Sequence, residues 1–340
     1  MNQPRSGRGS RITGTGYALP PRVVTNDDLA ARLDTSDEWI TSRSGIRRRH
    51  VVDPGTATSD LAIEAGAEAL KADLRGGGSG AVDLLVLATS TPDRPCPATA
   101  PLVAARLGLG HIPAFDLNAV CSGFLYGLST ATSAIAAGTA TSVLLVGADT
   151  FSTIVDPTDR RTAFLFGDGA GAIVLRGTDD NRRDGDVHAV RLGSDGDLEE
   201  LIVVPHGGSR HPAAQDPTDV WFTMQGQAVY RHAVDRMARS ALEVTDAAGW
   251  SVGDVDRVVG HQANLRILQA VASRIGLPAD RLVVDLDRVG NTAAASIPIA
   301  LAEAARDGDL HPGHRIVLTG FGGGATWGAA ALTWPHSARC

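Results

Sequence analysis

The sequence predicts an α/β protein built from two similar halves, and two observations support this. Short runs of Val, Leu and Ile, such as residues 143–146, alternate with Ala-rich stretches of helical character. Continuously apolar strands of this kind are typical of sheets that are covered on both faces. The second observation is an internal repeat with a period of about 170 residues. A chain of 340 residues is long enough to bury such a duplicated core.

Three pairs of segments, in the same order in both halves, carry the repeat. The pairs are residues 82–86 with 255–259, 114–117 with 283–286, and 142–147 with 315–320. We expect the boundary in the polar stretch 178–186, which gives an N-terminal half, 1–178, and a C-terminal half, 179–340. Catalytic groups from both halves are expected to meet at their junction. The Pro-, His- and Gly-rich residues 205–219 are expected to form a long surface loop.

Composition excludes several classes of protein. A hydrophobic fraction of 43% and a charged fraction of 20% are ordinary for a folded soluble protein. The net charge of −7 argues against nucleic acid as the main partner. Cys96, Cys121 and Cys340 are too few and too scattered for a disulfide framework or a zinc site, so we expect a reducing cytoplasm and no metal. No stretch has the character of a signal peptide or a membrane span.

Cys121 is the candidate nucleophile of the first half. It follows an extended apolar segment and precedes residues 122–128, which have a helical period. A thiol at a helix N-terminus is expected to be stabilised as the thiolate by the helix dipole. Its small neighbours leave room for an acyl thioester. The alternative is a buried structural cysteine, which is the more common role of a lone cysteine.

His261 and Asn291 are the candidate polar groups of the second half. His261 ends the strand-like run 257–260, and Asn291 lies between Gly290 and an Ala-rich helix. The ends of buried strands are where α/β proteins place their sites. The alternatives are a structural histidine and a helix-capping or turn asparagine. A thiol that attacks, an imidazole that handles a proton and an amide that holds an oxyanion together make an acyl-transfer site.

Glycine-rich segments and an arginine run complete the candidates. Residues 321–328 follow an apolar strand, and their glycines allow the backbone to aim N–H groups at a carbonyl oxygen. The segment lacks the consecutive Lys-Ser/Thr pair that ends a phosphate-binding loop. Residues 166–171 are interpreted as a structural turn. The arginines at 47–49 are expected to form a solvated surface.

Taken together, these segments resemble the ketosynthase III family, the 3-oxoacyl-acyl-carrier-protein synthases III of the thiolase superfamily. The resemblance extends from about Arg11 to Leu332 and rests on eight segments in family order. They are residues 35–40, 43–47, 119–124, 159–162, 165–171, 261–266, 290–298 and 321–328.

The resemblance implies a thiolase fold, a duplicated αβαβα five-layer sandwich, assembled as a homodimer. Cys121 would accept the acyl group of an acyl-CoA, and malonyl-acyl-carrier protein would then lose CO₂ and attack the thioester. His261 and Asn291 would donate hydrogen bonds to the malonyl thioester oxygen, and the N–H groups of Cys121 and Gly323 would form an oxyanion hole. No permanently bound cofactor is implied, because coenzyme A enters as the thioester substrate. The product would be a 3-oxoacyl-acyl-carrier protein that starts fatty-acid or polyketide synthesis.

The resemblance also implies a coenzyme A site. Trp39 and Arg160 match the positions that sandwich the adenine, through stacking and a cation–π contact. Arg43 matches a position near the CoA phosphates. Asn264 and Gly226 match positions that line the pantetheine channel.

Carrier-protein docking and primer selection are implied at two further places. Basic positions around the channel mouth, which suit an acidic carrier protein, are Arg231, Arg266 and Arg274. Phe321 is expected in the acyl pocket, together with Cys96 from the partner subunit. Several family members have a bulky Phe where this chain has Cys96, so the pocket is expected to be deeper and to accept primers longer than acetyl.

Two other functions remain open from the sequence. One is an acyltransferase of the same fold that passes the acyl group from Cys121 to a hydroxyl or an amine of a secondary metabolite. The other is a catalytically silent partner subunit. An intact set of Cys121, His261 and Asn291 counts against the silent subunit and favours carbon–carbon bond formation.

Overall fold

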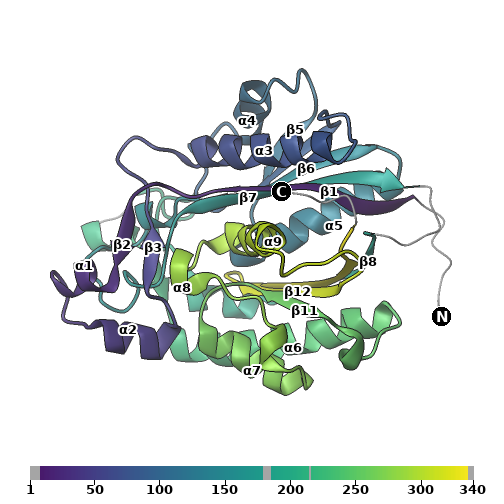
Figure 1. Cartoon of the computed structure of the whole chain (residues 1–340). Coiled ribbons are helices and arrows are strands. Elements are labelled where there is room, and N and C mark those ends of the chain that lie inside the picture. The colour runs from purple at the N-terminus through teal and green to yellow at the C-terminus, as the bar shows by residue number, and fades with distance from the viewer. Residues whose placement is uncertain (1–7, 179–184, 214–215, 336–340) are drawn as a thin grey trace.

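The computed structural model describes residues 8–178, 185–213 and 216–335, and these form five alternating layers of helix and sheet (Figure 1). The outer helices α3 (Thr58–Arg75) and α4 (Ala100–Arg106) cover the first sheet. The helices α5 (Gly123–Ala136) and α9 (Ser296–Arg306) lie between the two sheets, and α6 (Gly226–Ala247) and α7 (Leu265–Ile275) form the opposite outer layer. The predicted boundary adjoins residues 179–184, which, like Cys340, lie outside the described residues.

The first sheet has the strand order β1-β7-β6-β4-β5. Its strands are β1 (Gly9–Ala18), β4 (Leu84–Ala88), β5 (Ala114–Leu117), β6 (Ser142–Asp149) and β7 (Gly169–Thr178). β4 is parallel to β5 and β6, whereas β7 is antiparallel to both of its neighbours. The buried strands β4 and β6 explain the continuous apolar runs in the sequence.

The second sheet repeats this arrangement with the order β11-β12-β13-β8. Its strands are β8 (Val187–Ser194), β11 (Arg257–Gly260), β12 (Arg315–Gly322) and β13 (Thr326–Thr333). β11 and β12 are parallel, and β13 is antiparallel to both β12 and β8. The predicted α/β class and the duplication are therefore confirmed.

One repeated segment differs between the halves. Residues 114–117 form β5, but their counterpart, residues 283–286, forms no strand. Leu282, just before it, makes a single parallel bridge to Val258, and Val283 N donates to Val258 O at 3.0 Å. The side chain of Gln262 donates to the carbonyl oxygen of Val283 at 3.1 Å and so occupies part of the ladder. The helix α8 (Leu286–Val289) then begins almost at once. A full strand therefore has no room to form.

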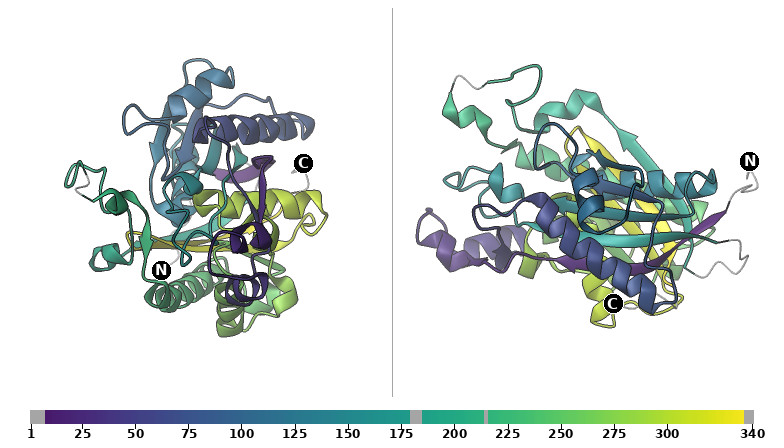
Figure 2. Two further views of the ribbon diagram at one scale, coloured as in Figure 1. Left: turned by 90° about the vertical axis from the view of Figure 1, so that its left-hand side faces the viewer. Right: turned by 90° about the horizontal axis from the view of Figure 1, so that it is seen from above.

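The purple segment that contains β2 (Val23–Thr25), α1 (Asn26–Ala30), α2 (Asp37–Ser44) and β3 (Arg48–His50) projects beyond one end of the sheets (Figure 2). The other regular elements of the described residues are β9 (Ile202–Val203), β10 (Thr223–Met224) and seven short 3₁₀ helices, of which Val120–Ser122 is the one that matters for the site. In the predicted long loop, residues 207–213 are exposed. Within the described ranges, no helix combines the length and the apolar character that a membrane span needs.

Close backbone contacts hold the central helices against the sheets. A Cβ at Gly171 of β7 would lie 2.6 Å from the backbone N of Ile299 in α9, and one at Gly147 of β6 would lie 2.4 Å from the carbonyl oxygen of Ala294. Only glycine permits contacts this short. They hold the segment that follows Asn291 against the end of β6.

The prediction that the arginine run is solvated is wrong for Arg49. Arg47 and Arg48 are exposed, but Arg49 in β3 is 1% exposed. Its guanidinium donates to Val24 O at 3.0 Å, to Asn26 Oδ1 at 2.9 Å and to Phe164 O at 2.8 Å. Burial lowers the pKa of Arg49 to about 10, so it remains charged at neutral pH. These carbonyl partners come from distant segments, which a local sequence pattern cannot reveal.

Candidate active site

The structure brings Cys121, His261 and Asn291 together at one cavity with about 40 Å³ of free space. This is room for about three water molecules. The other lining residues are mainly aromatic and aliphatic and include Phe151, Phe166, Phe222, Met237 and Phe321. The three polar side chains come from segments that are up to 170 residues apart, one in the first half and two in the second. The site is therefore a nearly apolar pocket with three converging polar groups.

Cys121 lies in the 3₁₀ turn that leads into α5, and 7% of its surface is exposed. Burial raises the pKa of its thiol well above the usual range, and the nearby carboxylate of Asp149 raises it further. Only its own backbone N–H acts in the opposite direction. The prediction that the helix N-terminus favours the thiolate is therefore wrong in its net direction, because desolvation of the charged sulfur outweighs the helix.

Asp149, at the end of β6, is a site residue that the sequence reasoning missed. It is 0% exposed, and its carboxylate accepts hydrogen bonds from Ser90 N at 2.7 Å and from Ala294 N at 2.9 Å. Two threonine hydroxyls also donate to it. Burial raises its pKa to about 6. An acidic residue at the end of the apolar run 142–148 was the signal that could have identified it.

His261 follows β11 and is 4% exposed. Its Nδ1 lies 2.7 Å from Ser296 Oγ at the start of α9. Burial lowers the pKa of the ring to about 4, so the imidazole is neutral at pH 7. A neutral imidazole has one N–H donor and one acceptor nitrogen. If the Ser296 hydroxyl donates to Nδ1, then Nε2 carries the hydrogen and is the donor.

Asn291 is oriented by its own backbone and by the residue that precedes it. Its backbone N donates to Leu165 O at 2.9 Å, and its Oδ1 accepts from Ala293 N at 3.0 Å. This bond leaves the NH₂ group as the part of the carboxamide that serves the cavity. Gly290 has φ 74°, and a Cβ there would lie 2.9 Å from Cβ of Arg49. Glycine is thus required before Asn291 for both conformation and space.

The glycine-rich segment lies directly on the nucleophile turn. A Cβ at Gly322 would lie 2.8 Å from the backbone N of Cys121. Gly323 follows it and is buried against Ile202. Phe321, predicted for the acyl pocket, lines the cavity together with Cys121. Cys96 is exposed and does not line the cavity within this chain.

The residues predicted to bind adenine are close together, but in a closed arrangement. The guanidinium carbon of Arg160 lies 5.2 Å from the ring centroid of Trp39, and that of Arg43 lies at 5.9 Å. Arg160 also forms an ion pair with Asp34 at 2.9 Å. An adenine between two flat groups needs two contacts of about 3.5 Å each, which is about 7 Å in all. Arg160 must therefore move away from Trp39 before a base can enter.

The predicted pantetheine positions have different surroundings. Asn264 is the N-cap of α7, where its Oδ1 accepts from Arg266 N at 2.8 Å and its Nδ2 donates to Arg43 O at 2.9 Å. Its side chain thus already joins α7 to α2. Gly226 is exposed at the start of α6, and Cε of Met224, at 3.9 Å, is the only atom near the position of an added Cβ. Met224 also lines the cavity.

The three predicted docking arginines are exposed on α6 and α7. Arg274 forms an ion pair with Asp235 at 2.6 Å, which offsets its charge. Arg231 and Arg266 form no ion pair with any residue that the structure describes. In the same part of the chain, no group of three or more His, Cys, Asp or Glu side chains is arranged to hold a metal ion.

Comparison with protein families and known proteins gives a consistent result. The model of the 3-oxoacyl-[acyl-carrier-protein (ACP)] synthase III C terminal matches residues 245–334, and the model of 3-oxoacyl-[acyl-carrier-protein (ACP)] synthase III matches residues 115–196. The chain is 57% identical to a beta-ketoacyl-[acyl-carrier-protein] synthase III of Streptomyces coelicolor, over 95% of this chain and 97% of that protein. It is 50% identical to the corresponding protein of Pseudomonas aeruginosa, over 96% and 97% of the two chains.

Solved structures agree with these relatives. The crystal structure of 3-oxoacyl-(acyl carrier protein) synthase III from Pseudomonas aeruginosa matches with a TM-score of 0.89 at 49% identity, over 96% of this chain and 99% of that one. The priming beta-ketosynthase from the R1128 polyketide biosynthetic pathway matches with a TM-score of 0.89 at 33% identity, over 98% of both chains.

Proposed function

The chain belongs to the 3-oxoacyl-[acyl-carrier-protein] synthase III family, and we propose that Cys121, His261 and Asn291 perform its reaction, the condensation of an acyl-CoA with malonyl-acyl-carrier protein. The enzyme is an acyltransferase that forms a carbon–carbon bond with loss of CO₂. The observation that carries the assignment of residues is the convergence of these three side chains on one apolar cavity.

The first half-reaction moves the acyl group to Cys121. Because burial raises the pKa of the thiol, Cys121 is protonated in the free enzyme and must lose its proton as it attacks. The thiol proton passes to the departing sulfur of coenzyme A, because His261 has its acceptor nitrogen Nδ1 on Ser296 Oγ and its Nε2 as a donor. The new sulfur–carbon bond to Cys121 replaces the carbon–sulfur bond to coenzyme A. The N–H groups of Cys121 and Gly323 stabilise the negative oxygen of the intermediate.

The second half-reaction needs no external base. Loss of CO₂ from the malonyl group leaves an enolate, whose oxygen receives hydrogen bonds from His261 Nε2 and the NH₂ group of Asn291. The carbanion then attacks the Cys121 thioester, the carbon–sulfur bond breaks, and the released thiolate of Cys121 takes up a proton from water. A neutral His261 suits this role, because a cation would bind the malonyl carboxylate and so stabilise the substrate instead of the transition state.

The substrates bind along the surfaces described for α2, α6 and α7. Trp39 and Arg160 hold the adenine once Arg160 moves aside, and Arg43 lies near the phosphates. Arg231 and Arg266, which are exposed and without ion pairs in the described chain, attract the acidic carrier protein. The free thiol of Cys121 fits a reducing cytoplasm.

A homodimer is supported by the edge of the first sheet. β5 is an edge strand, and Phe115 on it is 39% exposed, next to α4 with Leu102 at 43%. An apolar edge strand is a ready site for pairing with a second copy. This arrangement would also allow Cys96 to contribute to the cavity of the partner subunit.

Mass spectrometry of the two half-reactions tests the assignment. Incubation with an acyl-CoA is expected to add one acyl mass to the peptide that contains Cys121, and Cys96→Ser is the matched control that remains acylated. Asn291→Ala is expected to be acylated but to form 3-oxoacyl product on the order of 10² to 10³ times more slowly, because it lacks a preorganised donor. Acylation at Cys96 with Cys121 unmodified, or condensation by Asn291→Ala at the wild-type rate, would contradict the proposal.

A further inference from the structure

A pair of hydroxyl groups joins the nucleophile turn to the glycine-rich segment. Thr326, the first residue of β13, has its Oγ1 2.9 Å from Ala119 O and 3.0 Å from Gly323 O. In return, Ser122 Oγ donates to Thr326 O at 3.0 Å. Ser122 is 0% exposed, and Thr326 is partly buried. The two segments are more than 200 residues apart in the sequence.

The two carbonyl groups that Thr326 contacts lie one peptide unit away from the N–H groups of the oxyanion hole. Ala119 O also accepts the N–H of Ser122 at 3.1 Å, which closes the turn that contains Cys121. On the other segment, the carbonyl of Gly323 belongs to the residue whose N–H is the second donor. The hydroxyl of Thr326 therefore fixes both turns at the residues that determine where the donors point.

The nucleophile turn and the glycine-rich segment are in direct contact, so the hydroxyl hydrogen bonds between them affect how the two segments lie relative to each other. The position of an added Cβ at Gly322 lies 2.8 Å from Cys121 N and 3.0 Å from Ser122 N, so the backbones touch. The carbonyl oxygens of Ala119 and Gly323 both lie close to Oγ1 of Thr326. These three partially negative oxygens repel one another unless a hydrogen atom lies between them. The single hydroxyl proton of Thr326, shared by both carbonyls, supplies that attraction.

We propose that Thr326 is a positioning residue, whose hydroxyl holds the N–H groups of Cys121 and Gly323 in register so that both donate to one oxyanion. The inference rests on the oxyanion hole proposed above. Catalysis by such donors depends on their placement, and a displacement of about 1 Å costs on the order of 10²-fold in rate.

The test compares Thr326→Val, which keeps the shape but loses the hydroxyl, with Thr326→Ser, which keeps the hydroxyl. Single-turnover acylation of Cys121 by an acyl-CoA is measured by mass spectrometry, and alkylation of Cys121 by iodoacetamide is measured in parallel. Alkylation forms no oxyanion, so it reports only the state and accessibility of the thiol. Thr130→Val, which loses a similar hydroxyl bond to Tyr126 O within α5, is the matched control.

Thr326→Val is expected to be acylated about 10- to 100-fold more slowly at saturating acyl-CoA, with unchanged half-saturation, alkylation rate and melting temperature. Thr326→Ser and Thr130→Val are expected to stay within about threefold of the wild type. Acylation of Thr326→Val at the wild-type rate, or a parallel loss of acylation and alkylation, would overturn the inference. If Thr326→Val does not fold, the same comparison is made between Thr326→Ala and Thr326→Ser. Failure of the wild type to be acylated at Cys121 would instead refute the proposed function.

Discussion

At the scale of single residues, burial controls the charge of the groups around the cavity. Cys121, Asp149 and His261 are each at most 7% exposed, and each has its pKa shifted towards its neutral form. Asp149 ionises above about pH 6 and then disfavours the thiolate of Cys121 still further. A protonated thiol next to a neutral imidazole suits a reaction in which the proton moves only when the acyl donor arrives. Because the thiol is protonated, Cys121 reacts slowly with oxidants and with electrophiles other than its acyl donor.

The first prediction concerns His261 and acid stability. Its pKa is about 4 in the folded protein and 6.5 when unperturbed, so its neutral form stabilises the fold above pH 6.5 and this contribution is lost as the pH falls through about 4. Between pH 7.5 and 4.5, the wild type is expected to lose about 2 to 3 kcal/mol of unfolding free energy through this residue. Urea denaturation at both pH values measures it.

His261→Gln is expected to show a smaller acid loss than the wild type, by this amount. The control is His211→Gln in the exposed loop, which is expected to follow the wild type. An equal acid loss in His261→Gln and the wild type would show that His261 is not a buried neutral group.

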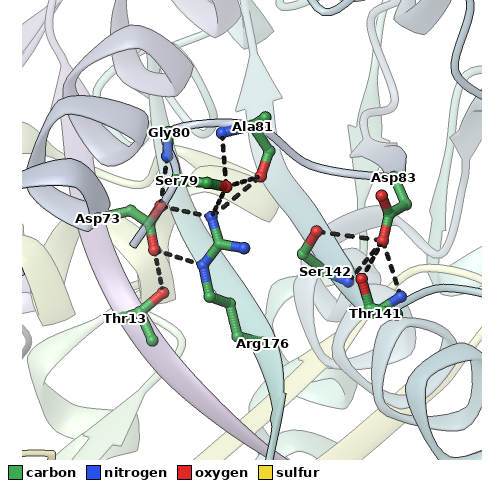
Figure 3. Close-up of polar contacts among 9 residues, drawn as sticks. All are labelled: Thr13, Asp73, Ser79, Gly80, Ala81, Asp83, Thr141, Ser142 and Arg176. Atoms are coloured by element: carbon green, nitrogen blue, oxygen red, sulfur yellow. Dashed lines mark hydrogen bonds and ion pairs between the residues drawn. The ribbon is translucent and has the colours of Figure 1, made fainter. Parts of the chain in front are cut away.

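At the scale of elements, a buried ion pair fastens the outer helix α3 to the first sheet (Figure 3). Asp73 near the end of α3 is 0% exposed and accepts from Arg176 Nη2 in β7 at 2.6 Å and from Thr13 Oγ1 in β1 at 2.6 Å. Burial alone would raise the pKa of Asp73, but the hydrogen bonds from Arg176, Thr13 and Gly80 N lower it below the usual value. Nearby, Asp83 receives hydrogen bonds from Thr141 and Ser142 and links the starts of β4 and β6.

The second prediction is that Arg176→Met destabilises the enzyme by about 3 to 5 kcal/mol, because it leaves the buried carboxylate of Asp73 without its partner. The double variant Asp73→Asn with Arg176→Met is expected to recover part of the loss, since no buried charge remains. Urea denaturation measures both. Arg75→Met, at the exposed end of α3, is the control and is expected to change stability by less than about 0.5 kcal/mol. A loss below about 1 kcal/mol in Arg176→Met would mean that the pair is dispensable.

At the scale of the whole molecule, we propose that Cys96 connects primer choice to the assembly of two subunits. Cys96 is exposed in the chain and is absent from the lining of its own cavity, so any effect on the acyl pocket must be exerted on a partner subunit. The exposed apolar edge at Phe115 provides a surface for such a partner. Primer selection would then be a property of the dimer.

The third prediction is that Cys96→Phe shifts the primer preference towards acetyl-CoA. Each buried methylene contributes roughly 0.8 kcal/mol, so about two extra carbons favour a longer primer roughly tenfold in the wild type. Phe in place of Cys96 fills that space, and overpacking is itself costly. The measurement is kcat/KM for acetyl-, butyryl-, isobutyryl- and hexanoyl-CoA, with Cys96→Ala as the control that keeps the space open.

A mixed dimer separates this effect from a change within one chain. One subunit carries Cys96→Phe together with Cys121→Ala, and its partner is wild type, so only the wild-type subunit reacts. The shift towards acetyl-CoA is expected to persist in this dimer. Strong acetyl preference in the wild type, or a mixed dimer with the wild-type preference, would mean that another residue sets the depth of the pocket.

The sequence by itself determined the class of fold, the repeat and the candidate chemistry. Apolar strands and Ala-rich helices have periodic patterns that can be recognised in the sequence alone. The repeat at about 170 residues predicts two similar halves, and the two sheets have matching strand orders. The segments around Cys121, His261 and Asn291 supplied the candidate residues and the family resemblance, and the comparisons confirm the family. The assigned catalytic roles and the division at residue 178 remain predictions.

Only the tertiary structure decided which groups are buried and which distant groups they meet. It placed Arg49 inside the protein, identified Asp149 beside Cys121, reversed the expected shift of the thiol pKa and brought Arg160 onto the ring of Trp39. Each of these depends on desolvation or on a hydrogen bond between segments that lie far apart in the chain. Such terms are set by the complete packing of the two halves, so no local pattern of residues contains them.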